Sequence, residues 1–356
     1  MEHYSILRRM QDVYDREARK MPSDVTGNFA AWQKEARKKL RELLALDKFE
    51  KAPLSAKLLS KEKRDGYTVE KREMETEPDV FMPFYVLIPD GACETDKRAC
   101  VITPHGHGGG KNGTVREFSE EELALLPPAR RERMGKSDCF ALSLVKRGYI
   151  VLAPDARGAG ERREFMNAGP ENAFTNSHAP INNLAISLGY SMCGMEVFDL
   201  MCLADYAVSR PDADGRLGAG GMSGGGQQTL FFAACDERIS VSVVSGWFYG
   251  FKESLLLLPH NCACNFVPDL WKYFDCCDIG ALIAPRALHI ESGENDHLNG
   301  NVGKIQNVVS QVEITRKAYK ALNAESELLH FIHPGVHEWN GSMAYDFISP
   351  RLPAKL

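Results

Sequence analysis

The chain has 356 residues, of which 44% are hydrophobic and 26% are charged, and its formal net charge at pH 7 is −5. This length and composition are typical of a globular protein with one large domain or two small ones. The basic residues are scattered among acidic ones, and this pattern argues against nucleic acid as a partner.

The first residues lack the apolar segment of a secretory signal, and no stretch of the sequence approaches the length of a membrane span. We therefore expect a cytoplasmic protein that does not associate with a membrane. In that compartment the ten cysteines are expected to be free thiols. The sequence leaves open whether the protein forms a homo-oligomer.

Residues 1–60 are charged and are expected to form an N-terminal helical extension. Trp32, Ala36 and Leu40 recur on one face of a predicted helix. The remainder, residues 61–356, is expected to be a single domain. It opens with an antiparallel hairpin, because residues 67–74 and 81–88 have a β-strand pattern and a Pro-Asp turn joins them.

After the hairpin, short apolar runs alternate with helical segments, which is typical of a mostly parallel sheet flanked by helices. The expected strands are residues 99–104, 149–154, 217–219, 239–244, 286–292 and 327–333. The expected helices are residues 138–147, 195–209, 225–234 and 305–322. Two irregular stretches, about 161–190 and 247–279, are expected to be insertions over the active site.

The sequence Gly-Met-Ser-Gly-Gly at residues 221–225 lies between a predicted strand and a predicted helix. This is the context of the Gly-x-Ser-x-Gly turn, in which a strained serine is lifted above the sheet and flanking glycines avoid a clash. Glycine-rich turns around serine are common, so this pattern is weak unless other catalytic residues accompany Ser223.

A serine nucleophile needs a base, and the base needs a carboxylate that orients it. The loop after strand 286–292 offers Glu294 and Asp296, of which Asp296 is favoured because Glu294 comes two residues early. Glu291 lies inside the predicted strand and is expected to point away from the active site.

The base is expected to come from the loop after the last strand. His337 lies in this loop, whereas His330 and His333 lie on the strand and are expected to be packing residues. Serine, acid and histidine then follow the chain order of the α/β-hydrolase fold. Each also follows the end of a strand, where open α/β sheets bind ligands.

Two backbone N–H groups are expected to stabilise the oxyanion. One belongs to Gly224, directly after the serine, and the other to His107 in the sequence His-Gly-His-Gly-Gly at residues 105–109. Further along, Asp155 and Arg157 follow a strand and are expected to pair with each other.

We expect no metal and no cofactor. His105 and His107 lack a third ligand at zinc-like spacing. The other candidates, His260, Cys262, Cys264 and the Cys276-Cys277 pair, contain no Cys-x-x-Cys motif, and most intracellular cysteines are buried small hydrophobic residues.

Taken together, these residues resemble the α/β-hydrolase superfamily, in particular its acetyl xylan esterase-like and dienelactone hydrolase-related branch. The resemblance covers roughly residues 66–345. It rests on His-Gly-His-Gly-Gly (105–109), Ala-Pro-Asp-Ala-Arg-Gly (153–158), Gly-Met-Ser-Gly-Gly-Gly (221–226), Ile-Ala-Pro-Arg (283–286) and Gly-Glu-Asn-Asp (293–296). It implies that Ser223, Asp296 and His337 are catalytic and that His107 contributes to the oxyanion hole.

The expected activity is cleavage of a short-chain carboxylic ester through an acyl-enzyme, with acetylated carbohydrate as one candidate substrate. Trp247, Phe248, Tyr249 and Trp271 lie in or beside the second insertion and are the only sequence indication of a carbohydrate. One alternative is a serine peptidase of the prolyl oligopeptidase kind, but the segment before residue 105 is too short for its β-propeller. The other is a non-catalytic binding protein on the same fold.

Overall fold

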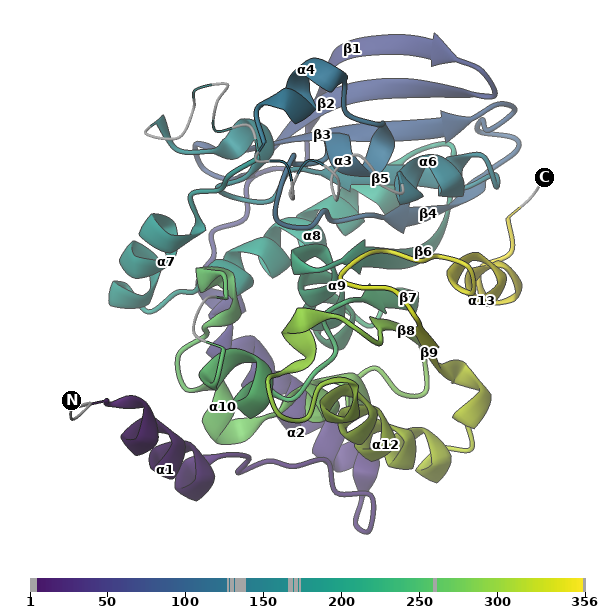
Figure 1. Cartoon of the computed structure of the whole chain (residues 1–356). Coiled ribbons are helices and arrows are strands. Elements are labelled where there is room, and N and C mark those ends of the chain that lie inside the picture. Colours follow the sequence, from purple (N-terminus) through teal and green to yellow (C-terminus); the bar gives the residue numbers. More distant parts are fainter. Residues whose placement is uncertain are drawn as a thin grey trace.

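The computed structural model describes residues 5–126, 128, 131, 139–165, 169, 172, 174–258 and 261–354. Within these residues, nine strands form one sheet in the order β1-β2-β3-β5-β4-β6-β7-β8-β9 (Figure 1). The strands are β1 (Ala56–Arg64), β2 (Tyr67–Glu77), β3 (Val80–Pro89), β4 (Arg98–Ile102), β5 (Ile150–Pro154), β6 (Ala213–Met222), β7 (Ile239–Ser245), β8 (Ala287–Gly293) and β9 (Leu328–His333).

The first three strands are antiparallel, and β3 also pairs antiparallel with β5. From β5 onward, all neighbours in the sheet are parallel. The expected hairpin and the mostly parallel sheet are therefore confirmed. The carboxyl ends of the parallel strands lie along one edge, where the loops after β4, β6, β8 and β9 meet.

Every residue of β4 and β5, near the centre of the sheet, is buried, which explains their nearly continuous apolar runs. On β4, Cys100 and Ile102 pack into one hydrophobic cluster, and Ala99 and Val101 into another on the opposite face. The first cluster includes residues of α2 (Phe29–Leu43), α8 (Met192–Ser209), α9 (Gly224–Cys235), α11 (Cys276–Ala281) and α12 (Ile305–Ala321). The second includes α6 (Phe140–Val145) and α13 (Ala344–Arg351).

The N-terminal extension consists of α1 (Leu7–Glu17) and α2, but it ends sooner than expected. The boundary expected at residue 60 lies inside β1, because Ala56 already pairs with Met74 of β2. Almost every residue of β1 is exposed. An edge strand with charged side chains on both faces has no apolar alternation that would reveal it in the sequence.

Two other helices differ from the prediction. The first insertion, predicted to be irregular, contains α7 (His178–Ser187), and the end of the chain, predicted to be a short tail, contains α13. No single helix in the described ranges is long and apolar enough to span a bilayer, but the bent pair of α7 and α8, at 98° to each other, reaches that length and composition together. His260 of the second insertion and Asp138 before α6 lie outside the described residues.

The expected pairing of Asp155 with Arg157 is wrong. Arg157 donates to both carboxylate oxygens of Asp199 on α8, at 2.7 and 3.0 Å, and also pairs with Glu77 at 2.7 Å. Arg162 donates to Asp199 as well, at 2.7 Å. Asp199 is buried, so these two guanidinium groups join the loop after β5 to the helix layer through a carboxylate that water does not reach.

Replacing Asp199 by Asn is expected to lower the free energy of unfolding at pH 7 by about 3–5 kcal/mol, because two buried guanidinium groups lose their shared counter-charge. Burial alone would raise the pKa of Asp199, but Arg157 and Arg162 outweigh it and lower the pKa. The stabilisation is therefore present above the unfolded-state pKa of about 3.9 and is lost as the pH falls through the lower folded-state value. Urea unfolding at pH 7 and at pH 3 measures both effects.

The control for this prediction is Asp205→Asn on the same helix. Asp205 also pairs with two cations, Lys51 and Arg238, but near the surface. Exposed pairs contribute about 1 kcal/mol or less. Equal losses in the two variants at pH 7 would contradict the role given to burial at Asp199.

Candidate active site

Ser223 lies at the turn between β6 and α9, with backbone angles φ 60° and ψ −122°. A non-glycine residue with positive φ is strained, and such strain is typical of functional turns. The turn is possible because its neighbours are glycines. A Cβ on Gly221 would lie 2.4 Å from the carbonyl oxygen of Gly225, and a Cβ on Gly225 would lie 2.1 Å from that of Pro104.

The structure brings Ser223, Asp296 and His337 together from the loops after β6, β8 and β9. His337 Nε2 lies 2.8 Å from Ser223 Oγ, and His337 Nδ1 lies 2.7 Å from Asp296 Oδ2. Since a carboxylate accepts, Nδ1 carries the proton and Nε2 accepts from the serine hydroxyl. All three residues are buried.

The structure distinguishes Asp296 from its sequence alternative Glu294. Glu294 is exposed, whereas Asp296 is buried beneath His337. Asp296 Oδ1 accepts from the backbone N–H of Leu298 at 2.8 Å. Burial would raise the pKa of Asp296, but the bond to His337 and this backbone bond outweigh it and lower the pKa. Asp296 is thus anionic at neutral pH.

Glu291 has a role that the sequence did not reveal. Its buried carboxylate accepts from the backbone N–H of Asn340 at 2.6 Å and of Gly341 at 2.8 Å, and from Ser245 Oγ at 2.9 Å. Burial raises its pKa. These bonds fasten the loop that carries His337 to the sheet. The only feature of the sequence that indicates this role is an acidic residue at a strand position that is expected to be buried.

The loop after β4 passes directly beside Ser223. A Cβ on Gly106 would lie 3.0 Å from the carbonyl oxygen of Met222 and 3.3 Å from Ser223 Cβ. The ring of His107 packs against Gly224, where a Cβ would lie 2.8 Å from His107 Cε1. As the first residue of α9, Gly224 has an N–H group without an intrahelical acceptor. His107 and Gly224 therefore lie next to the serine, and their role in an oxyanion hole stays a prediction.

Buried polar contacts fix this loop at both ends. His105 Nδ1 donates to the carbonyl of Gly106 at 2.7 Å, and its Nε2 accepts from the N–H of Ala156 at 3.0 Å. Burial lowers the pKa of His105, so the ring is neutral. At the other end, Asp155 accepts from Lys111 Nζ at 2.5 Å and from its backbone N–H at 2.8 Å.

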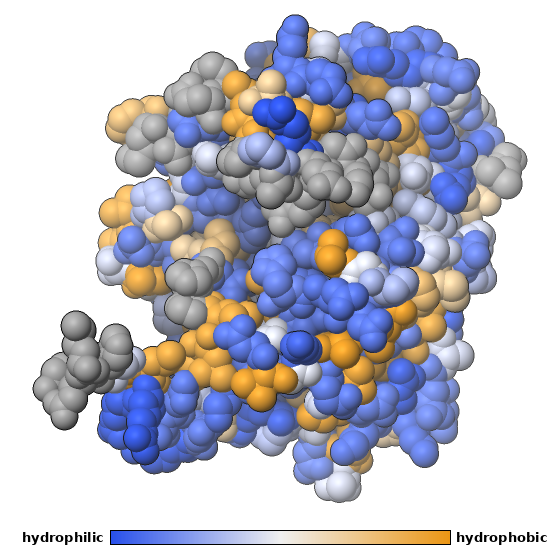
Figure 2. Space-filling model, in the orientation of Figure 1, coloured by the Kyte–Doolittle hydropathy of each residue, from blue (hydrophilic) through white to orange (hydrophobic). Residues whose placement is uncertain are grey.

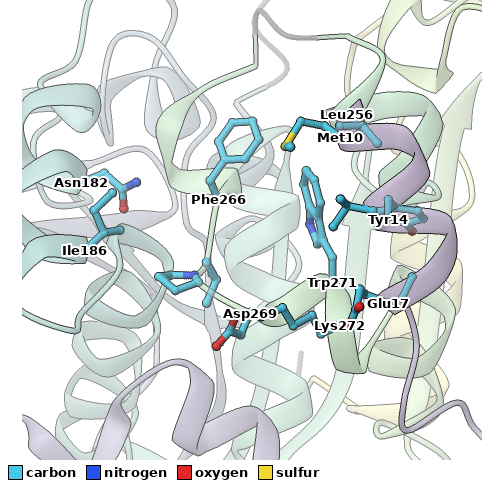
Figure 3. Close-up of a pocket in the computed structure, with 14 residues that line it drawn as sticks. Met10, Tyr14, Glu17, Asn182, Ile186, Leu256, Phe266, Asp269, Trp271 and Lys272 are labelled. Carbon is cyan, nitrogen blue, oxygen red and sulfur yellow. Dashed lines mark ion pairs between the residues drawn. The ribbon is translucent and has the colours of Figure 1, made fainter. Parts of the chain in front are cut away.

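A separate apolar groove of about 410 Å³ lies between α1, α7 and the second insertion. Asn182 and Ile186 of α7 lie across it from Tyr14 of α1 and Trp271, whose rings are in edge-on contact (Figure 3). Figure 2 shows the corresponding apolar surface next to α1. Among the described residues that line this groove, none belongs to the group of Ser223, Asp296 and His337.

The aromatic residues of the second insertion are mostly core residues. Trp247, Phe248 and Tyr249 are buried, and Trp247 Nε1 donates to Asn265 at 2.8 Å. Only Trp271 is partly exposed, and it lines the apolar groove. These side chains therefore provide no stacking surface for a sugar beside Ser223.

Comparison with known proteins agrees with this architecture. A protein of Bacillus subtilis (strain 168) that carries the name "Putative hydrolase YtaP" is 30% identical over 288 residues, which cover 78% of this chain and 87% of that protein. A "putative acetyl xylan esterase" from Bacteroides fragilis superposes with a TM-score of 0.74 at 22% identity, covering 93% and 83% of the two chains. A glucuronoyl esterase from Solibacter usitatus has a TM-score of 0.59 at 16% identity, covering 87% and 90%. The profile of the Abhydrolase family matches residues 2–321. The chain belongs to the Abhydrolase family and has the α/β-hydrolase fold.

Proposed function

We propose that this protein is a serine hydrolase that cleaves short-chain carboxylic esters through an acyl-enzyme intermediate. The observation that carries the proposal is the unbroken pair of hydrogen bonds from Ser223 through His337 to Asp296. Ser223 has a strained backbone conformation and directly precedes α9. The free backbone N–H groups at the start of a helix stabilise negative charge that develops there.

In the proposed reaction, Ser223 Oγ attacks the ester carbonyl carbon while His337 Nε2 takes the hydroxyl proton. The same proton then passes to the leaving alcohol as its bond to the acyl carbon breaks. Water attacks the acyl-enzyme with His337 again as the base, and this step releases the acid and free Ser223. Asp296 keeps the imidazole in the tautomer that can accept at Nε2.

The oxyanion is proposed to bind the backbone N–H groups of Gly224 and His107. Both residues lie next to Ser223. A Cβ on Gly106 would contact Ser223, and a Cβ on Gly224 would contact the ring of His107, so the backbone approaches closely here. Fixed donors of this kind do not reorganise during the reaction, and this makes them effective in a site from which water is excluded.

The ester class follows from the relatives. The similar structures carry the names acetyl xylan esterase and glucuronoyl esterase, so an ester of a carbohydrate, first of all an acetylated one, is the candidate substrate we propose to test. A peptidase of the prolyl oligopeptidase kind has less support, because the similar structures named above carry the names of esterases.

The test is labelling with a fluorophosphonate, followed by peptide mass spectrometry and hydrolysis of p-nitrophenyl esters of increasing chain length. We expect the label on Ser223 of the wild type, none on Ser223→Ala, and turnover of acetate above that of long-chain esters. A folded wild-type protein with neither label nor turnover would show that the fold serves as a binding scaffold instead.

A further inference from the structure

Four side chains of the types that bind metal ions meet at the loop after β4, although they come from three segments that are far apart in the sequence. They are His107 of that loop, His178 at the start of α7, and Cys262 and Cys264 around the 3₁₀ turn Ala263–Asn265. One ligand atom from each residue lies within 4.8 Å of all the others. We call these four residues the Cys₂His₂ cluster.

The spacing suits a central ion. His107 Nε2 lies 3.1 Å from Cys264 Sγ, and His178 Nδ1 lies 3.1 Å from Cys262 Sγ. Ligand atoms bound tetrahedrally to zinc lie roughly 3.3–3.8 Å from one another, since Zn–N and Zn–S bonds are about 2.0–2.3 Å long. The two distances of 3.1 Å are slightly shorter than this range, and all four ligand atoms lie within 4.8 Å of one another. Two sulfurs with two imidazole nitrogens are also a donor set that zinc prefers.

A buried carboxylate behind the cluster provides a second, independent observation. Glu196 on α8 is 2% exposed, and neither of its oxygens has a hydrogen-bond partner among the described residues. Its Oε1 lies 3.8 Å from His178 Nε2, which also lacks a hydrogen bond there. A histidine that binds a metal through one nitrogen commonly directs its other N–H group to a carboxylate. Glu196 occupies that position for His178.

The turn with the two cysteines is fastened independently of their thiols. Gln227 on α9 donates to the carbonyl of Cys264 at 2.9 Å, and Asn265 donates to the carbonyl of Cys262 at 3.0 Å. Asn265 in turn accepts from Trp247 Nε1 at 2.8 Å. His105, by contrast, uses both ring nitrogens in other hydrogen bonds and is not part of the cluster.

We propose that His107, His178, Cys262 and Cys264 bind one Zn²⁺ ion. The two thiols lose their protons to the solvent on binding, and the two imidazoles bind as neutral rings, so no oxidation or reduction takes place. Four protein ligands complete a tetrahedron without an open position, which is typical of structural rather than catalytic zinc. The ion joins both insertions to the loop whose residue His107 packs against Gly224.

This proposal departs from the expectation of no metal. The sequence analysis considered only ligands that lie close together in the chain. Cys262 and Cys264 are separated by one residue, so they do not form a Cys-x-x-Cys motif. Its partners lie 84 and 157 residues away. The proposal also does not depend on the ester hydrolase activity, because its test measures the metal itself.

The experiment is metal analysis of the full chain, purified without chelators, stripped, reconstituted with Zn²⁺ and dialysed. We expect about one zinc per chain in the wild type and about a tenth or less in Cys262→Ser and Cys264→Ser. Glu196→Gln is expected to weaken zinc affinity about 10- to 100-fold without removing a ligand. Cys276→Ser, a buried cysteine outside the cluster, and Ser223→Ala are expected to keep one equivalent.

Co²⁺ serves as the spectroscopic probe on the same protein. The wild type is expected to show thiolate-to-cobalt charge transfer and the strong visible bands of tetrahedral Co²⁺, and Cys264→Ser is expected to lose them. The proposal is wrong if reconstituted wild type holds no zinc, if the cysteine variants hold as much as the wild type, or if intact mass shows a Cys262–Cys264 disulfide. Wild type that binds zinc but neither hydrolyses esters nor reacts with the fluorophosphonate would refute the proposed function alone.

Discussion

Ser223→Ala is expected to lower kcat/KM for p-nitrophenyl acetate by about 10⁶-fold, because the variant has no oxygen that can form the acyl-enzyme. The residues around it stay in place, since alanine fits where serine does and only the 2.8 Å hydrogen bond between Ser223 Oγ and His337 Nε2 has to be given up. The residual rate over uncatalysed hydrolysis then reflects binding and the oxyanion donors alone. Initial rates on wild type and variant, with thermal unfolding of both, measure this effect.

The matched control is Ser240→Ala on β7, where the hydroxyl donates to the carbonyl of Leu217 at 2.9 Å, near the opposite end of the strand from the active site. We expect its activity to equal that of the wild type. If Ser223→Ala keeps more than about a hundredth of the wild-type rate, the nucleophile lies elsewhere, because loss of a nucleophile in a triad costs far more than this.

The centre of the fold could be predicted from the sequence because burial on both faces leaves a local signature. Strands β4 and β5 are short, mostly apolar runs between turn residues, and β7 and β8 combine buried apolar and polar residues. Each of the four lies within a few residues of its predicted bounds. The periphery left no such signature. Charged β1 has no buried face, and α7 and α13 lie where the pattern is interrupted by Pro, Asn and Gly.

The positions of Ser223, Asp296 and His337 were predictable for a related reason. Each follows the end of a parallel strand, so the fold itself brings the three loops to one edge of the sheet. Their catalytic roles stay predictions. What the sequence did not reveal are side-chain pairings between segments with no fixed register, such as Arg157 with Asp199, Glu291 with the His337 loop, and His178 with Cys262.

Asp296→Asn is expected to lower kcat by about 10⁴-fold, although the side chain keeps its shape. Asn can present its amide N–H groups to His337 Nδ1, which then accepts, and the ring proton moves to Nε2. In that tautomer Nε2 donates to Ser223 and cannot take its proton. The change therefore affects the chemical step more than substrate binding, and steady-state kinetics should show a fall in kcat with little change in KM.

Glu294→Gln is the control that the chain offers two residues away. Glu294 is the other acid that the sequence allows at this position, but its side chain is exposed, whereas Asp296 Oδ2 lies 2.7 Å from His337 Nδ1. Its kinetics should match those of the wild type. If Glu294→Gln and Asp296→Asn lose the same activity, the acid is not assigned to the correct residue. If neither loses activity, Asp296 does not orient His337, and the role proposed for Asp296 in the acyl-enzyme mechanism is wrong.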